Sequence, residues 1–214
     1  MTRLLDSGLE KLTTILFKMG GIAEEAVNLS VESFLQGTDT SEKVRSLSDL
    51  LVTLGTDAED TVFELIAKHQ PVASDLRILK SYMKASYDLE RYGRYAWDIS
   101  FTQKKLADSE ESSEDTHPPS LRKMAERVAE MVHISIGALR SHDPELAKQL
   151  TELEREVDGV YLKFLEKLGR ETSITKAYVS NILVTRYLER IADHAIYIGE
   201  SVVYIATGKR AILR

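Results

Sequence analysis

The sequence lacks cysteine altogether and contains only four prolines and eleven glycines in 214 residues. Without cysteine there are no disulfides or thiolate metal sites, so a metal ion would have to be held by carboxylates, carbonyl groups or the five histidines. No apolar run approaches the roughly 20 residues that span a bilayer, and the start, MTRLLDSGLEKL, lacks the long uncharged stretch of a signal peptide. We therefore expect a cytoplasmic protein without membrane insertion.

Basic residues are fewer than acidic ones, 28 against 34, so the net charge is -6. Nucleic-acid binding needs concentrated Lys and Arg to neutralise phosphates, so nucleic acid is not an expected partner. The sequence G-x-x-x-x-G-K-[ST] does not occur, so ATP hydrolysis is not supported. The Gly20-Gly21 pair is interpreted instead as a bend or a point of close packing inside a helix.

Apolar residues mostly recur every three or four positions, which predicts an all-α protein. The stretch DSEESSEDTHPP, residues 108–119, is acidic and contains no bulky apolar side chain, so it predicts a linker. The linker divides the chain into an N-terminal unit, 1–107, and a C-terminal unit, 120–214. Each unit is expected to hold three helices, with Pro71 beginning one of them and Ser120 and Ser173 capping two others. The expected ranges are about 4–35, 42–69, 71–106, 120–142, 144–169 and 173–207.

The two halves contain an internal repeat. Shifted by 99 residues, SDLRILKSYMKASYDLERYGRYA, residues 74–96, lies over SITKAYVSNILVTRYLERIADHA, residues 173–195. This repeat predicts that the third helix of each half descends from one ancestral element. We expect two tandem three-helix bundles with antiparallel neighbouring helices and an elongated molecule.

Two pairs of acidic residues occur in the second half. Glu154 and Asp158 are four residues apart, and so are Glu189 and Asp193, so each pair shares one helix face. Like charges at this spacing repel by a few tenths of a kcal/mol unless a cation lies between them. Carboxylates from two neighbouring helices could bind a hard cation such as Mg²⁺, Mn²⁺, Ca²⁺ or ferric iron. The alternative is a solvated acidic face.

Several phrases resemble the PhoU family of phosphate-uptake regulators, over nearly the whole chain. They are KHQPVASDLRILKSYMKASYDLERYGRYA at residues 68–96 and, in the second half, EREVDGVYLKF and YLERIADHA. The resemblance implies two three-helix bundles, each with an iron or zinc cluster held by paired Glu/Asp-x-x-x-Asp motifs. Manganese or magnesium remain alternatives for the metal.

The resemblance also implies a function. It indicates a non-enzymatic cytoplasmic regulator that negatively controls a phosphate ABC transporter, with the transporter's ATPase subunit as partner. In many bacteria the sensor histidine kinase of phosphate signalling is a further partner. We also expect a homodimer.

The second half matches both metal motifs, with Glu154 and Asp158 on the middle helix and Glu189 and Asp193 on the last. The first half departs from them, because the shift of 99 aligns the four positions with Gly55, Glu59, Glu90 and Arg94. One metal site is therefore expected, with Arg94 supplying a fixed positive charge near Glu90 in place of a metal. A displaced first-half site would use the nearby acids Asp57, Asp60 and Glu64.

Other interpretations remain open at this point. Glu130 and His133 form a Glu-x-x-His pair of the kind found in ferritin-like oxidases, but the second such pair, Glu114 and His117, falls in the linker. His194 is interpreted as a surface residue, with orientation of a metal ligand as the alternative.

The aromatic residues of the 71–106 helix are expected to pack in the core or at an interface, with base stacking as the alternative. They are Tyr82, Tyr87, Tyr92, Tyr95 and Trp97. PhoU-like bundles also serve as accessory modules of ion channels and of other transporters, which gives a second hypothesis for the function.

Overall fold

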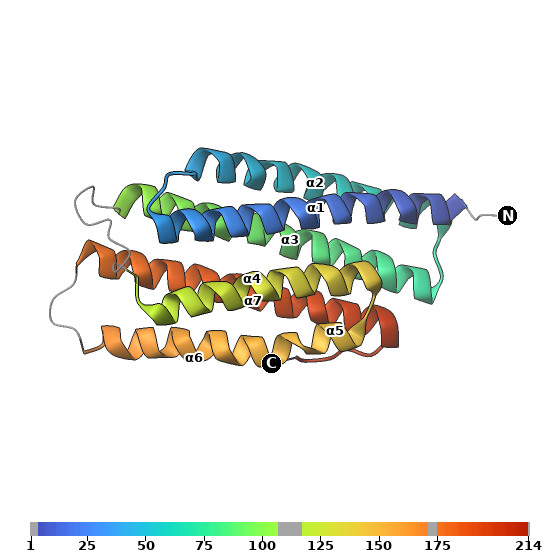
Figure 1. The fold of residues 1–214 in the computed structure, drawn as a ribbon. Helices are drawn as coiled ribbons and strands as arrows, with labels where there is room; N and C mark the ends of the chain where they lie inside the picture. Colours follow the sequence, from blue (N-terminus) through green and yellow to red (C-terminus); the bar gives the residue numbers. More distant parts are fainter. Residues whose placement is uncertain (1–3, 107–116, 171–174, 214) are drawn as a thin grey trace.

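The computed structural model describes residues 4–106, 117–170 and 175–213, and the regular structure in these ranges is helical. Two groups of long helices lie side by side with their axes in roughly one direction, which gives an elongated molecule (Figure 1). The first group is α1 (Leu4–Gln36), α2 (Ser41–His69) and α3 (Ala73–Leu106); the second is α4 (Pro119–Ser141), α5 (Pro144–Lys148), α6 (Leu150–Leu168) and α7 (Lys176–Thr207). The all-α prediction of two bundles related by a repeat is confirmed.

The helix ends follow local chemistry, with some departures from expectation. Helix α3 begins at Ala73 rather than Pro71, and α4 begins at Pro119, so Ser120 lies inside the helix. The Asp143 side chain accepts hydrogen bonds from the backbone N–H groups of the next turn and caps α5. Thr175 caps α7 in the same way. The expected cap Ser173 and most of the expected linker, residues 108–116, lie outside the described residues.

The expected 144–169 helix is divided into α5 and α6 at Gln149. Opposite this junction, α7 carries Gly199, and a Cβ atom there would lie 3.5 Å from the Ala147 carbonyl oxygen and 2.9 Å from Leu150. The junction therefore packs directly on the backbone of α7.

The two bundles share one continuous hydrophobic core, so they are not two units with separate cores. Helix α3 packs against α1, α2 and α7, and α7 packs against α3, α4, α5 and α6. Gly20 lets α1 approach α4 closely, because a Cβ atom there would lie 3.0 Å from Ile136. The sequence-based interpretation of Gly20 as a packing position is thus confirmed.

Helices α3 and α7 run antiparallel at the centre of the molecule. Tyr95 stacks on Tyr187 with ring centroids 6.4 Å apart, while Lys84, earlier in α3, lies 5.2 Å from the ring of Tyr197, later in α7. Because these helices are also the aligned elements of the repeat, the two halves are related by an approximate twofold rotation. Equivalent residues of the repeat consequently meet near the middle of this interface.

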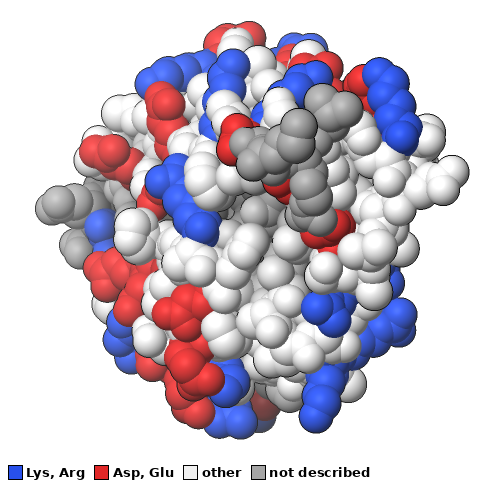
Figure 2. All heavy atoms as spheres, turned by 90° about the vertical axis from the view of Figure 1, so that its right-hand side faces the viewer, with Lys and Arg blue, Asp and Glu red and all other residues white. Residues whose placement is uncertain are grey.

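In the part of the chain that the structure describes, no helix is both long enough and apolar enough to cross a membrane. The end where α2 turns into α3 carries charged side chains of both signs around a middle of uncharged ones (Figure 2). Among the described residues on this face, Lys and Arg do not form the extended basic surface that a nucleic-acid backbone requires.

Candidate metal centre and the helix interface beside it

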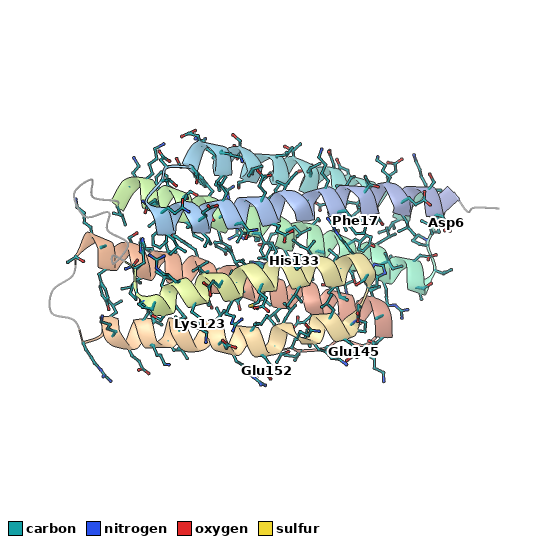
Figure 3. The ribbon with its side chains drawn as sticks, viewed as in Figure 1. Asp6, Phe17, Lys123, His133, Glu145 and Glu152 are labelled. Carbon is teal, nitrogen blue, oxygen red and sulfur yellow. The ribbon has the colours of Figure 1, made fainter. Side chains whose placement is uncertain are left out.

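The four predicted metal ligands lie on α6 and α7, which pack against each other. Glu154 and Asp193 are buried, each with 7% of its surface exposed, and the Glu189 side chain is only 12% exposed. Asp158 is partly buried. By contrast, Glu152 lies at the outer edge of α6 (Figure 3) and its side chain is 77% exposed. The predicted ligands are therefore not a solvated acidic face.

The charges of this group are unbalanced. Burial is the largest cause that raises the pKa of Glu189, and the carboxylate of Asp193 raises it further. Asp158, on the neighbouring helix, acts in the same direction, whereas Arg186 and Arg190 lower the pKa of Glu189. Arg186 forms an ion pair with Glu189 at 2.6 Å, and Arg190 forms one with Asp193, also at 2.6 Å. Two arginines thus pair with the two carboxylates of α7.

Carboxylates are the type of ligand that a hard cation prefers, and these four are held at low exposure. The positions of these side chains in the structure, however, do not suit a metal ion. Within the described ranges, no three His, Asp or Glu side chains are placed so that they could hold one metal ion. Binding a metal here would require the carboxylates to move closer together.

The corresponding positions of the first bundle are arranged differently. Gly55 lets the Glu90 carboxylate approach α2, since a Cβ atom at Gly55 would lie 3.3 Å from Glu90 Oε2. The Arg94 guanidinium lies over the Trp97 ring, 5.5 Å from its centroid. Among the described residues Arg94 forms no ion pair with Glu59 or Glu90. The Arg94 guanidinium thus stacks on Trp97 instead of pairing with an acid of the first bundle.

The three acids of a displaced first-half site are exposed on α2: Asp57, Asp60 and Glu64. Glu64 forms an ion pair with Lys68, one turn further along. These acids do not form a group that could hold a metal ion in the described part of the chain.

His194 points into the interface between the bundles rather than into solvent or toward a metal ligand. Its Nδ1 atom lies 2.8 Å from Asp88 Oδ1, and the side chains of His194 and Asp88 are 5% and 2% exposed. Burial raises the pKa of Asp88, and the hydrogen bond and charge of His194 oppose that rise. The pair joins α7 to α3, a contact that the sequence did not indicate.

A second polar contact crosses the same interface and was also missed. The Tyr95 hydroxyl lies 2.7 Å from Arg91 Nη2 and 3.4 Å from Arg190 Nε. One signal could have identified it, because the shift of 99 aligns Arg91 with Arg190.

The Glu130-x-x-His133 pair does not form half of a di-iron site. Glu130 accepts a hydrogen bond from Arg127, whereas His133 turns toward α1 (Figure 3) and its Nδ1 atom lies 2.8 Å from Glu24. His117 hydrogen-bonds to the side chain of Asn181 on α7. Glu114 lies outside the described residues.

The aromatic residues of α3 mostly pack inside the molecule. Tyr82, Tyr92 and Tyr95 are buried, and the Tyr92 hydroxyl lies 2.9 Å from Ser135 Oγ on α4. Tyr87 is 56% exposed. The prediction of core and interface packing is confirmed for the three buried tyrosines.

Comparison with known proteins assigns the chain to a family. The profile of the PhoU domain matches residues 16–101 and again residues 121–202. A protein of Clostridium acetobutylicum, named phosphate-specific transport system accessory protein PhoU homolog, is 31% identical over 222 residues, covering 100% of this chain and 99% of that protein.

Solved structures agree with this assignment. The crystal structure of PhoU from Pseudomonas aeruginosa has a TM-score of 0.85 at 27% identity and covers 95% of this chain and 99% of its own. The phosphate transport system regulatory protein PhoU from Streptococcus pneumoniae shares the fold, with a TM-score of 0.84 at 21% identity, covering 97% of this chain and 99% of that chain. With two matched domains and a relative similar over its full length, the chain belongs to the PhoU family.

Proposed function

We propose that the protein is a non-enzymatic cytoplasmic regulator that negatively controls a phosphate ABC transporter by binding the transporter's ATPase subunit. The observation that carries this proposal is the full-length similarity to a relative named as a phosphate-specific transport system accessory protein. Two matched PhoU domains, covering both bundles, support it. A homodimer is the expected form, and a sensor histidine kinase is a second expected partner.

A pull-down experiment tests the partner. The purified full-length protein is immobilised and offered the ATPase subunit of the phosphate transporter from the same organism, with a cytoplasmic cation-channel fragment in parallel. Retention of the ATPase alone supports the proposal. Retention of the channel fragment alone would favour the second hypothesis, an accessory module of another transport system.

The four carboxylates are proposed to bind a metal ion or cluster, iron or zinc first and manganese or magnesium as alternatives. The ligands would be Glu154 and Asp158 on α6 with Glu189 and Asp193 on α7. Support comes from their low exposure and from the raised pKa of Glu189, to which burial contributes most and the neighbouring carboxylates add. A bound cation would supply positive charge at this place and link the two helices.

Elemental analysis of purified protein tests the metal proposal. Wild-type protein should carry metal, Asp193→Ala should lose most of it, and Glu152→Ala should retain it. Glu152 is a matched control because it is an acid on α6 whose side chain is exposed and paired with Arg155. Full metal content in the Asp193→Ala protein would refute the assignment.

A further inference from the structure

Two guanidinium groups converge on one oxygen atom at the interface between the bundles. Arg91 Nη2 donates a hydrogen bond to Tyr95 Oη at 2.7 Å, and Arg190 Nε lies 3.4 Å from the same atom. The Arg91 guanidinium also lies over the Tyr95 ring, 4.6 Å from its centroid. Guanidinium groups from two helices thus share one neutral hydroxyl as a hydrogen-bond acceptor.

The two arginines are equivalent positions of the internal repeat, because Arg91 shifted by 99 residues is Arg190. They reach the same place because α3 and α7 cross antiparallel near the approximate twofold axis. The convergence is therefore a consequence of the duplicated architecture and is built from one arginine of each bundle.

The hydrogen-bonding capacity of these arginines is only partly used. A guanidinium has five N–H donors. Arg190 donates a hydrogen bond to Asp193 from one of its three nitrogens, and the Arg190 side chain remains 31% exposed. Arg91 is partly buried and, among the described residues, has Tyr95 as its hydrogen-bond partner and no ion-pair partner. Donors from two helices are thus left for another acceptor.

The pKa of the Tyr95 phenol indicates which sign of charge is favoured beside the two arginines. Burial opposes ionisation of its phenol, yet the hydrogen bonds from Arg190 and Arg91 outweigh burial and lower the pKa of Tyr95. Negative charge on an oxygen at this position is therefore stabilised.

Acidic groups on both helices oppose an anion here: Glu90 and Asp98 on α3, and Glu189 and Asp193 on α7. Asp98 lies two turns after Arg91 on α3; burial raises the pKa of Asp98, and the charges of Arg94 and Arg91 lower it. Arg94 adds a third guanidinium one turn from Arg91, over Trp97. Asp98 forms no ion pair with these arginines in the part of the chain that the structure describes.

We propose that Arg91, Arg190 and Tyr95 form a binding site for a phosphate dianion, either free inorganic phosphate or the phosphate group of a monoester. A tetrahedral dianion can accept hydrogen bonds from guanidiniums approaching from two helices and from a phenol hydroxyl at once. A single carboxylate, by contrast, can be satisfied by one guanidinium fork. The site adjoins the four carboxylates through the Arg190–Asp193 ion pair, but it contains none of them and does not require the metal proposal.

Binding is measured by calorimetric titration of full-length protein that has been freed of metal with a chelator. Inorganic phosphate and phenyl phosphate are the two ligands, and sulfate at equal ionic strength is the reference. Binding of inorganic phosphate alone identifies the free ion, and binding of phenyl phosphate alone identifies a phosphorylated side chain as the source. Removing metal first ensures that phosphate held by a metal cannot produce the signal.

Matched variants assign the site. Arg91→Gln should weaken phosphate binding by at least about tenfold, because it removes a charge-assisted donor without leaving a carboxylate unpaired. Arg94→Gln, one turn away and stacked on Trp97, should change the dissociation constant less than about threefold, since screened charges beyond contact distance act weakly.

Tyr95→Phe keeps the ring packing and should weaken binding by a few-fold, and thermal melts confirm that each variant is folded. No saturable binding of either ligand below about 10 mM, or equal binding by wild type and Arg91→Gln, would overturn the proposal. In that case the arginines would serve only to join the bundles. Regulation of phosphate uptake would be unaffected by this result, because that proposal is tested by partner binding and uptake.

Discussion

Removing the carboxylate of Asp88 should lower the free energy of unfolding by about 3 kcal/mol. Asp88 and His194 are 1% and 4% exposed and are joined by one contact of 2.8 Å. Their other polar atoms, Asp88 Oδ2 and His194 Nε2, are buried without hydrogen-bond partners in the described structure. In Asp88→Ala the His194 imidazole therefore loses its partner at a position that water does not reach. Leaving one member of a buried pair without its partner costs more free energy than removing both.

The magnitude depends on burial rather than on distance, and the chain offers a matched control. Glu24 and His133 are also 2.8 Å apart, but the side chains are 31% and 77% exposed. Glu24→Ala should cost less than about 1 kcal/mol, as exposed pairs generally do.

Urea denaturation of Asp88→Ala, His194→Leu and the double variant completes the test. The double variant should be less destabilised than the sum of the single variants by at least about 1 kcal/mol, because it leaves neither group buried alone. An Asp88→Ala protein within about 0.5 kcal/mol of wild type, or additive effects in the cycle, would refute the reasoning.

Two further predictions concern packing and pH. Gly93→Ala should lower the free energy of unfolding by about 1–2 kcal/mol in urea denaturation, because a Cβ atom there would lie 3.3 Å from the Ser48 Cα of α2. Gly159→Ala should raise it, because a Cβ atom there would have nothing within 4 Å. Burial lowers the pKa of His142, which hydrogen-bonds to Tyr82, so its contribution to stability is present above about pH 6.5 and is lost as the pH falls through the lowered pKa. Thermal melts from pH 7.5 to 5 should show this decline, and a His142→Asn protein with the same decline would contradict it.

The sequence predicted the helices and the repeat well because both depend on local pattern. The apolar residues that recur at helical spacing along α7, from Val184 to Ile205, are buried, as their periodicity indicated. The division at Gln149 was missed, and the packing of this junction on Gly199 of a distant helix has no local signal in the sequence.

The site was predicted only in part for a related reason. Spacing placed Glu154 and Asp193 on adjoining helices, but it could not show that both would be buried or that Arg190 would pair with Asp193. The Asp88–His194 pair depends on the antiparallel crossing of α3 and α7 and joins residues 106 positions apart. Such pairs follow from tertiary packing, which one sequence does not reveal.

The central claim is that this protein restrains phosphate uptake, and transport in cells tests it most directly. Initial uptake of radiolabelled phosphate is measured in phosphate-replete cells of the source organism, with the gene intact, deleted, and restored from a plasmid. The account predicts faster uptake in the deletion strain and a return to the original rate on restoration. Unchanged or slower uptake in the deletion strain would contradict it.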